Sequence, residues 1–193
     1  VDRLSGGRLG YVHISSMDDP SFRSVYADIL GKYNDREGIV IDTRFNGGGR
    51  LHEDIEILFS GKKYFTQVVR GREACDMPSR RWNKPSIMLT CEANYSNAHG
   101  TPWVYQHQGI GKVVGMPVPG TMTSVSWETL QDPTLYFGIP IVGYRLPDGS
   151  YLENKQLEPD VKIANSPEKI IKGEDEQLET AVKELLKEID SKK

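Results

Sequence analysis

The sequence lacks the signatures of several common classes of protein. Only two of its 193 residues are cysteines, Cys75 and Cys91, and neither has the spacing of a metal ligand. No apolar run approaches the roughly 20 residues that cross a bilayer. The glycines form neither a Gly-x-Gly-x-x-Gly dinucleotide motif nor a Gly-Lys-Ser/Thr phosphate loop. The basic residues are scattered and the formal net charge is −3, so we expect no nucleic-acid-binding surface.

The composition that remains is ordinary for a globular domain. Hydrophobic residues make up 37% of the chain and charged residues 26%. This length has room for one domain with a real core, so we expect residues 1–193 to form a single domain. The chain begins with Val1 rather than methionine, which predicts that it is a segment of a longer protein.

Strand-like and helix-like segments alternate along the chain, which predicts an α/β fold. The predicted strands cover residues 9–15, 38–44, 64–69, 87–91, 112–115 and 136–145. The predicted helices cover residues 51–60, 96–108 and 175–189, with an earlier helix that begins at Asp19 and is closed by residues 35–38. Residues 70–84 are predicted to form an exposed loop, and residues 116–134 irregular structure near a site.

Ser96 lies where a predicted buried strand gives way to a predicted helix. A hydroxyl in this position faces the positive end of the helix dipole and free backbone N–H groups. That environment suits a nucleophile whose reaction develops an oxyanion. The alternative is that Ser96 only caps the helix, because serine is a preferred N-cap residue.

Three successive glycines, residues 47–49, directly follow the predicted strand 38–44. Glycine permits positive φ angles and lets a backbone N–H approach another group closely. The glycines therefore predict either a sharp turn that needs flexible residues or an N–H group that donates to an oxyanion.

Six motifs occur in a fixed order along the chain. They are Gly10–Ile14 (GYVHI), Ile41–Gly49 (IDTRFNGGG), Asn94–Asn97 (NYSN), Leu146–Gly149 (LPDG), Leu152–Asn154 (LEN) and Glu158–Val161 (EPDV). Together they resemble the catalytic core of the C-terminal processing peptidases and, more closely, of tricorn-type serine proteases. The resemblance covers nearly the whole chain and implies a Clp protease/crotonase-like α/β core of repeated ββα units with a C-terminal helix. It also implies peptide-bond hydrolysis through an acyl-enzyme, without metal, nucleotide or other cofactor.

The resemblance assigns roles to individual positions. Ser96 matches the nucleophile, and the N–H groups of Asn97 and of Gly48 or Gly49, with Gly49 favoured, would form the oxyanion hole. Such a donor is worth about 2.7–4 kcal/mol of transition-state stabilisation. Glu153 matches a glutamate that orients the base, although on local sequence it reads equally as a solvated loop carboxylate.

The general base does not follow from these motifs. Bacterial processing peptidases use a Ser–Lys dyad, but the lysine position falls at Thr121, and no lysine stands between Lys112 and Lys155. The tricorn branch uses a histidine in a helical region upstream of a PDZ-like module, and both would precede Val1. We therefore expect the base to come from outside residues 1–193.

The four histidines are the competing candidates within the chain. His99 lies three residues after Ser96 and can neighbour it on one helix face, although helical geometry points it along the surface. His52 follows the glycine loop and can approach the site. His13 and His107 are predicted to be structural.

Substrate and partners are predicted more broadly. Gln67 stands where the resemblance places an acidic residue that selects basic side chains, so its neutral amide predicts no basic preference. The expected partners are a peptide or unfolded protein substrate, upstream regions of the parent chain and a second copy in a homo-oligomer. Processing peptidases often act outside the cytoplasm, so the resemblance favours an extracytoplasmic, periplasmic location.

Two other functions remain open. A catalytically degenerate module of the same fold would bind peptides without cleaving them, as the missing base suggests. An acyl-CoA-handling crotonase relative would share only the architecture, and the Ser96-Asn97 turn and the Glu153 motif disfavour it.

Overall fold

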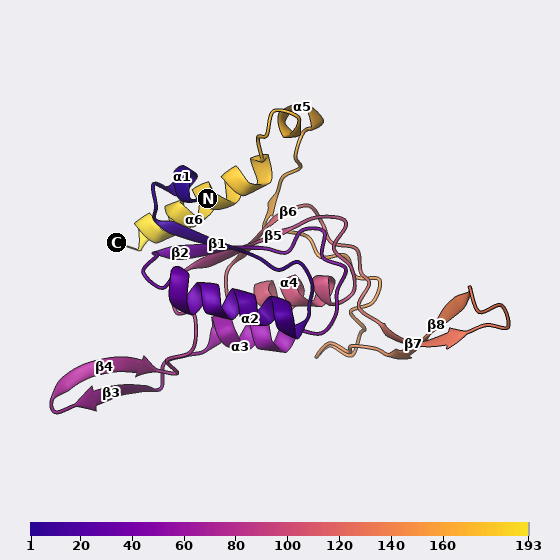
Figure 1. Ribbon diagram of the computed structural model, residues 1–193, viewed down its shortest axis with the longest axis horizontal. Helices are drawn as coiled ribbons and strands as arrows, with labels where there is room; N and C mark the ends of the chain where they lie inside the picture. Colours follow the sequence, from indigo (N-terminus) through magenta and orange to yellow (C-terminus); the bar gives the residue numbers. More distant parts are fainter. Residues whose placement is uncertain (193) are drawn as a thin grey trace.

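A five-stranded parallel sheet forms the centre of the computed structural model, which describes residues 1–192 (Figure 1). All neighbouring strands run parallel, in the order β1-β2-β5-β6-β9. The strands are β1 (Leu9–His13), β2 (Gly38–Asp42), β5 (Ser86–Thr90), β6 (Lys112–Gly115) and β9 (Val161–Lys162). The predicted α/β class is confirmed.

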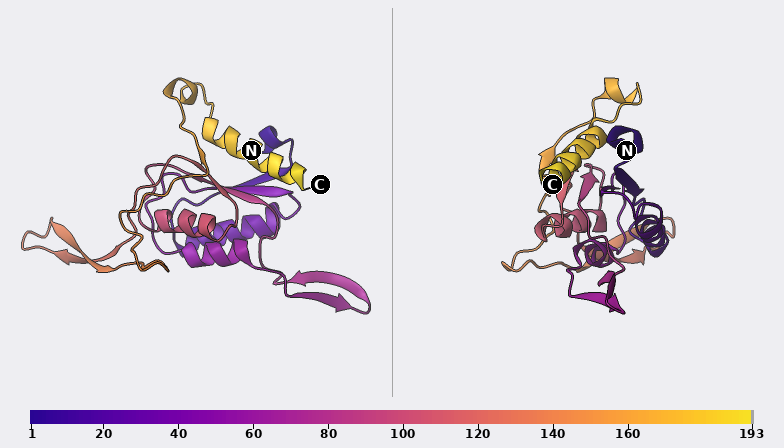
Figure 2. Two further views of the ribbon diagram at one scale, coloured as in Figure 1. Left: turned by 180° about the vertical axis from the view of Figure 1, so that it is seen from behind. Right: turned by 90° about the vertical axis from the view of Figure 1, so that its left-hand side faces the viewer.

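Helices cover both faces of this sheet (Figures 1 and 2). One face carries α2 (Asp19–Ala27), α3 (His52–Ser60) and α4 (Asn97–His107). The other face carries α1 (Asp2–Ser5) and α6 (Glu176–Ser191). A π-helical turn, η1 (Asp28–Lys32), continues α2, and the short α5 (Pro167–Ile170) lies before α6. Among the helices of residues 1–192, none is long and apolar enough to cross a membrane.

The core has two halves because side chains of a strand alternate between the two faces of the sheet. Ile39, Ile41 and Met88 pack into the half beneath α2, α3 and α4. Val40 and Leu89 pack into the other half, against the apolar stripe of α6. Burial on both faces explains why these strands read as continuous apolar runs in the sequence.

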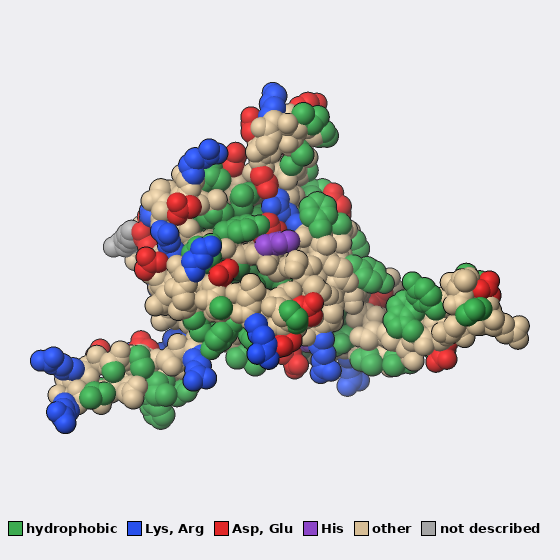
Figure 3. Space-filling view, viewed as in Figure 1, with side chains coloured by type: hydrophobic (Ala, Val, Ile, Leu, Met, Phe, Trp, Pro, Cys, Tyr) green, Lys and Arg blue, Asp and Glu red, His purple; other side chains and the backbone are tan. Residues whose placement is uncertain are grey.

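Two antiparallel hairpins extend from the sheet domain (Figure 1). They are β3 (Phe65–Val69) with β4 (Arg72–Met77) and β7 (Ser124–Thr129) with β8 (Tyr136–Val142). β4 corrects the predicted loop 70–84, and β7 corrects the predicted irregular stretch 116–134. Figure 3 shows hydrophobic side chains exposed on both hairpins.

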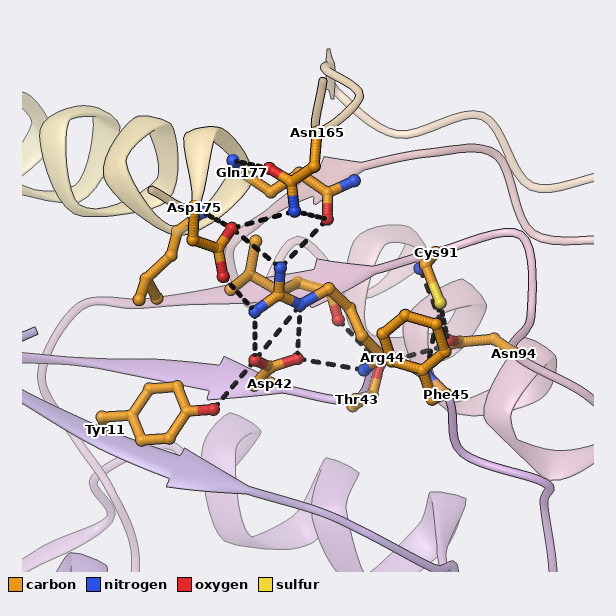
Figure 4. Close-up of polar contacts among 12 residues, drawn as sticks. Tyr11, Asp42, Thr43, Arg44, Phe45, Cys91, Asn94, Asn165, Asp175 and Gln177 are labelled. Carbon is orange, nitrogen blue, oxygen red and sulfur yellow. Dashed lines mark hydrogen bonds and ion pairs between the residues drawn. The ribbon is translucent and has the colours of Figure 1, made fainter. Parts of the chain in front are cut away.

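A buried charge cluster fastens α6 to the central sheet (Figure 4). The Arg44 guanidinium lies between two carboxylates, with Nη2 2.7 Å from Asp42 Oδ2 and 2.8 Å from Asp175 Oδ2. Its Nη1 donates to Gln177 Oε1 at 3.0 Å, and the Tyr11 hydroxyl donates to Asp42 Oδ2 at 2.9 Å. The cluster therefore joins β1, the end of β2 and the start of α6.

Asp175 makes this cluster sensitive to acid. Burial by itself would raise the pKa of Asp175, but the hydrogen bonds from Arg44 and from the Leu178 N–H outweigh it and hold that pKa below its usual range. A carboxyl with a lowered pKa contributes its full stabilisation above its unfolded pKa of about 4 and loses it as the pH falls through the folded value.

We expect Asp175→Asn to weaken the domain at neutral pH and to flatten its acid sensitivity. Asparagine keeps the N-cap on α6 but removes the charge. The free energy of unfolding in urea should fall by about 1.5–3 kcal/mol at pH 7, and the drop between about pH 5 and pH 3 should shrink. Glu174→Gln, at an exposed neighbour, should change both quantities by under about 0.5 kcal/mol. Equal acid slopes for wild type and Asp175→Asn would contradict this role.

Candidate active site

The glycine loop and the Ser96 turn meet at one edge of the sheet. β2 and β5 are parallel neighbours, so the loops that follow them emerge side by side, where ligands bind in open α/β sheets. A Cβ atom placed on Gly48 would lie 2.7 Å from Ser96 Cβ and 2.8 Å from the Tyr95 carbonyl oxygen. Gly48 also has a φ of 96°. The loop can approach Ser96 this closely only because that residue is glycine.

Ser96 itself has a strained backbone and does not cap α4. Its φ of 54° and ψ of −122° lie far from the extended conformation of an N-cap residue, and its side chain makes no capping hydrogen bond. A non-glycine residue in such a region costs of the order of 1–3 kcal/mol, and such residues cluster at functional sites. The capping interpretation of Ser96 is therefore wrong.

Asn46 holds the loops around Ser96 in place, a role that the sequence did not indicate. Its buried side chain donates from Nδ2 to the Ile14 carbonyl at 2.7 Å and accepts at Oδ1 from the Gly48 N–H at 2.8 Å. Its own carbonyl oxygen accepts from the Tyr95 N–H at 3.0 Å. One asparagine thus ties the segment after β1 to both the glycine loop and the Ser96 turn.

The Asn97 side chain anchors the neighbouring helix. Its Oδ1 accepts from the Leu51 N–H at 2.7 Å and from the His52 N–H at 3.2 Å, at the start of α3. Leu51 occupies the N-cap position of α3 and supplies no side-chain cap. Asn97 therefore caps α3 from a different element and fixes the first turn of α4 against the residues that follow the glycine loop.

Two backbone N–H groups stay free beside Ser96. Within residues 1–192, the N–H groups of Gly49 and Asn97 donate no hydrogen bond, whereas that of Gly48 is taken by Asn46. Asn97 is the first residue of α4, so its N–H points out of the positive end of the helix. Of the two glycines predicted for the oxyanion hole, Gly49 has a free backbone N–H group, whereas the N–H group of Gly48 already donates to Asn46.

A short segment connects Ser96 with Glu153. The Ser96 N–H donates to Thr121 Oγ1 at 3.1 Å, and the Thr123 N–H donates to Glu153 Oε2 at 2.6 Å. Burial by itself would raise the pKa of Glu153, but hydrogen bonds from Thr123 and the Met122 backbone outweigh it and lower that pKa below its usual range. Glu153 is therefore ionised at neutral pH and held in place, not a freely solvated carboxylate.

The histidines do not reach Ser96 within the described chain. His99 is fully buried, which corrects its predicted surface position, and burial lowers its pKa so that the ring is neutral at pH 7. His52 Nδ1 accepts from Asn97 Nδ2 at 2.8 Å. His13 is exposed at the end of β1, and His107 stacks on Trp103 at the end of α4. No hydrogen bond joins any of these rings to the Ser96 side chain in residues 1–192.

Gln67 is not brought to Ser96 within one chain. It lies on β3, exposed, and accepts a hydrogen bond from Cys75 Sγ at 3.3 Å. The β3–β4 hairpin projects from the end of the molecule opposite to β7–β8 (Figures 1 and 2). β7 follows directly from the Thr121 contact with Ser96, so the active-site edge is the β7–β8 end. Within residues 1–192, no three His, Cys, Asp or Glu side chains lie together as metal ligands would.

The fold and this edge define an α/β protein in which a serine at a strained turn faces a glycine loop. The sequence model of Peptidase family S41 matches residues 8–163, and the chain belongs to this family. It is 28% identical over 187 residues to Tricorn protease homolog 1 of Streptomyces coelicolor, covering 94% of this chain and 17% of that protein. It is 25% identical over 190 residues to the Tricorn protease of Thermoplasma acidophilum, covering 98% and 18%.

Solved structures have the same fold. The crystal structure of the tricorn protease superposes with a TM-score of 0.84 at 23% identity, over 98% of this chain and 18% of that chain. The photosystem II D1 C-terminal processing protease superposes with a TM-score of 0.59 at 18% identity, over 81% and 42%. The resemblance to tricorn-type and C-terminal processing peptidases is confirmed, and this chain spans less than a fifth of the two curated relatives.

Proposed function

We propose that residues 1–193 form the core of a serine peptidase that cleaves peptide bonds through an acyl-enzyme at Ser96. The observation that carries the proposal is the strained, non-capping Ser96 beside two free N–H groups. Strain at a turn between strand and helix exposes a nucleophilic hydroxyl, as in nucleophile elbows of other hydrolases.

The proposed reaction uses the groups at this edge in turn. Ser96 Oγ attacks the carbonyl carbon of the substrate while a base takes its proton. The carbonyl oxygen becomes an oxyanion that accepts from the Gly49 and Asn97 N–H groups. The amine then leaves with the proton, and water releases the acyl group by the same steps in reverse.

The base is proposed to come from outside residues 1–193. A serine hydroxyl is a weak nucleophile without a base, and no lysine or histidine contacts the Ser96 side chain in the described residues. Glu153 is ionised and held by the segment that contacts Ser96, so it can orient an incoming base and stabilise the positive charge that the base gains when it takes the Ser96 proton.

Labelling with a fluorophosphonate probe tests this proposal. We expect strong labelling of the full-length parent protein, little labelling of the 193-residue chain alone, and none of the parent with Ser96→Ala. Labelling of the isolated chain that Ser96→Ala abolishes would place the base inside it, and His52 and His99 would be replaced next.

A second function stays open because of the missing base contact. A peptide-binding module without catalysis would keep the loop and the turn but leave Ser96 unactivated. Absence of labelling in the parent, together with measurable binding of an unfolded protein, would favour that module over a peptidase.

A further inference from the structure

An apolar pocket lies between the loops of the active-site edge and the chain that leads into α6. It has a volume of about 440 Å³. Its apolar lining residues are Phe45, Cys91, Ala93, Met116, Ala164 and Ile170. Phe45 stands between β2 and the glycine loop, and Ala93 belongs to the turn between β5 and Ser96. The pocket is therefore built partly from the same two loops that build the proposed active site.

The amide side chains that line this pocket are already paired within the protein (Figure 4). Gln177 Nε2 donates to the Ile163 carbonyl at 2.9 Å, and Gln177 Oε1 accepts from Arg44 Nη1 at 3.0 Å. Asn165 Nδ2 donates to Asp175 Oδ1 at 3.1 Å, and Asn165 Oδ1 accepts from the Gln177 N–H at 2.9 Å. Because these amides are satisfied, the pocket offers a ligand chiefly apolar contact.

The ring of Phe45 is exposed, yet its backbone is firmly held. Phe45 has a φ of 62° and is 78% exposed. Its N–H donates to Cys91 Sγ at 3.2 Å, and the residues on either side, Arg44 and Asn46, are buried and hydrogen-bonded. A bulky residue rarely adopts a positive φ, and strain of this kind collects at functional sites. The fold thus fixes an aromatic ring beside the pocket, and a ring that is already in place loses little freedom when a ligand binds.

The pocket is within reach of a peptide bound at Ser96. Ala93 is three residues from Ser96, and Phe45 is three residues from Gly48, so neither pair of Cα atoms is more than about 11 Å apart. An extended peptide advances about 3.3 Å per residue. A side chain three or four residues from the scissile bond can therefore enter the pocket.

We propose that this pocket binds a large apolar side chain of the peptide substrate, packed on the Phe45 ring, within about four residues of the bond that Ser96 cleaves. The inference rests on the proposed peptidase function and adds a substrate class to it. Large apolar side chains are accessible in unfolded segments because folded proteins bury most of them. The exposed carboxylate of Glu92, which also lines the pocket, disfavours an acidic residue next to the apolar one.

Peptide binding to the full-length parent carrying Ser96→Ala tests the pocket without cleavage. The probes are fluorescein-labelled ten-residue peptides of alanine and serine in which the fifth residue is either leucine or serine. We expect fluorescence anisotropy to show at least about tenfold tighter binding of the leucine peptide, the lower end of what burial of a leucine supplies. Phe45→Ala removes the ring and Ala164→Leu fills the pocket, so each should reduce this ratio to within about twofold.

A matched change on another face controls for the loss of exposed apolar surface. Ile57 on α3 is 65% exposed and does not line this pocket, so Ile57→Ala should keep the binding ratio. Circular dichroism checks that every variant is folded. Equal binding of the two peptides, or a ratio that both folded pocket variants leave intact, would overturn the proposal. A leucine preference in the 193-residue chain that the parent lacks would also overturn it, because a segment of the parent would then occupy the pocket.

Hydrolysis of the same peptides by the parent with Ser96 intact separates this inference from the peptidase proposal. Leucine-selective binding without hydrolysis would contradict the peptidase and leave a peptide-binding pocket. Hydrolysis that requires Ser96 but has the same KM for both peptides, in the wild type and in the pocket variants, would contradict the pocket alone.

Discussion

Ser96→Ala is expected to lower kcat of the proposed peptidase about 10⁶-fold, the scale of loss when a serine peptidase loses its nucleophile. KM should change little, because substrate binding does not use the hydroxyl. Any residual rate would come from binding and the two N–H donors. Hydrolysis of a set of fluorogenic peptides, chosen without basic bias because Gln67 is neutral, measures the effect.

Stability distinguishes this result from a capping role. Loss of a capping serine would cost about 0.5–2 kcal/mol, whereas Ser96 makes no capping hydrogen bond. The free energy of unfolding of Ser96→Ala should therefore stay close to that of the wild type while activity disappears. Unchanged hydrolysis, or a stability loss on the capping scale with activity retained, would count against Ser96 as the nucleophile.

The buried strands could be predicted because burial leaves a signal in the sequence. β2, β5 and β6 lie with both faces covered, so each reads as an uninterrupted apolar run with clear ends. The predicted strand 112–115 has the bounds of β6. The prediction of α6 was off by no more than two residues at either end, since its apolar stripe packs on the sheet.

Two of the four hairpin strands, β4 and β7, gave no such signal, whereas the predicted strands 64–69 and 136–145 contain β3 and β8. β4 is almost wholly exposed and mixes charged, small and sulfur-containing residues, so a single sequence reads it as a loop. β7 lies in a stretch rich in Gly, Pro, Ser and Thr and owes its strand form to pairing with β8. Where neither face of a strand is buried within the chain, its apolar and polar residues need not alternate, so the sequence gives no periodic signal for the strand.

Contacts between segments that are distant in the chain also could not be predicted from the sequence. Arg44 belongs to a recognised motif, but its partner Asp175 lies 131 residues further along the chain. Helical spacing alone points His99 along the surface, whereas in the fold its side chain is enclosed and lies near Glu153. Helical spacing gives the direction of a side chain but not what packs over it.

Gly49→Ala is expected to reduce catalysis by at least about 10²–10³-fold, the loss associated with one oxyanion donor. A Cβ atom on Gly49 would lie 2.1 Å from the Met17 carbonyl oxygen, and the residue has a φ of 137°. That oxygen accepts from the Arg50 N–H, and the Met17 N–H donates to the Gly48 carbonyl. The clash is therefore with backbone that is itself held, so the loop must shift and carry the Gly49 N–H away from Ser96.

Gly47→Ala supplies the matched control. A Cβ atom on Gly47 would meet nothing within 4 Å, and the residue needs no positive φ. Gly47→Ala should keep activity within a few fold of the wild type. Gly49→Ala should lower kcat much more than it changes KM, because an oxyanion donor acts in the transition state. Thermal unfolding of both variants separates an effect on catalysis from an effect on folding. If the loss of activity in Gly49→Ala merely follows its folded fraction, or if the two variants are equally active, the glycine loop has only a structural role.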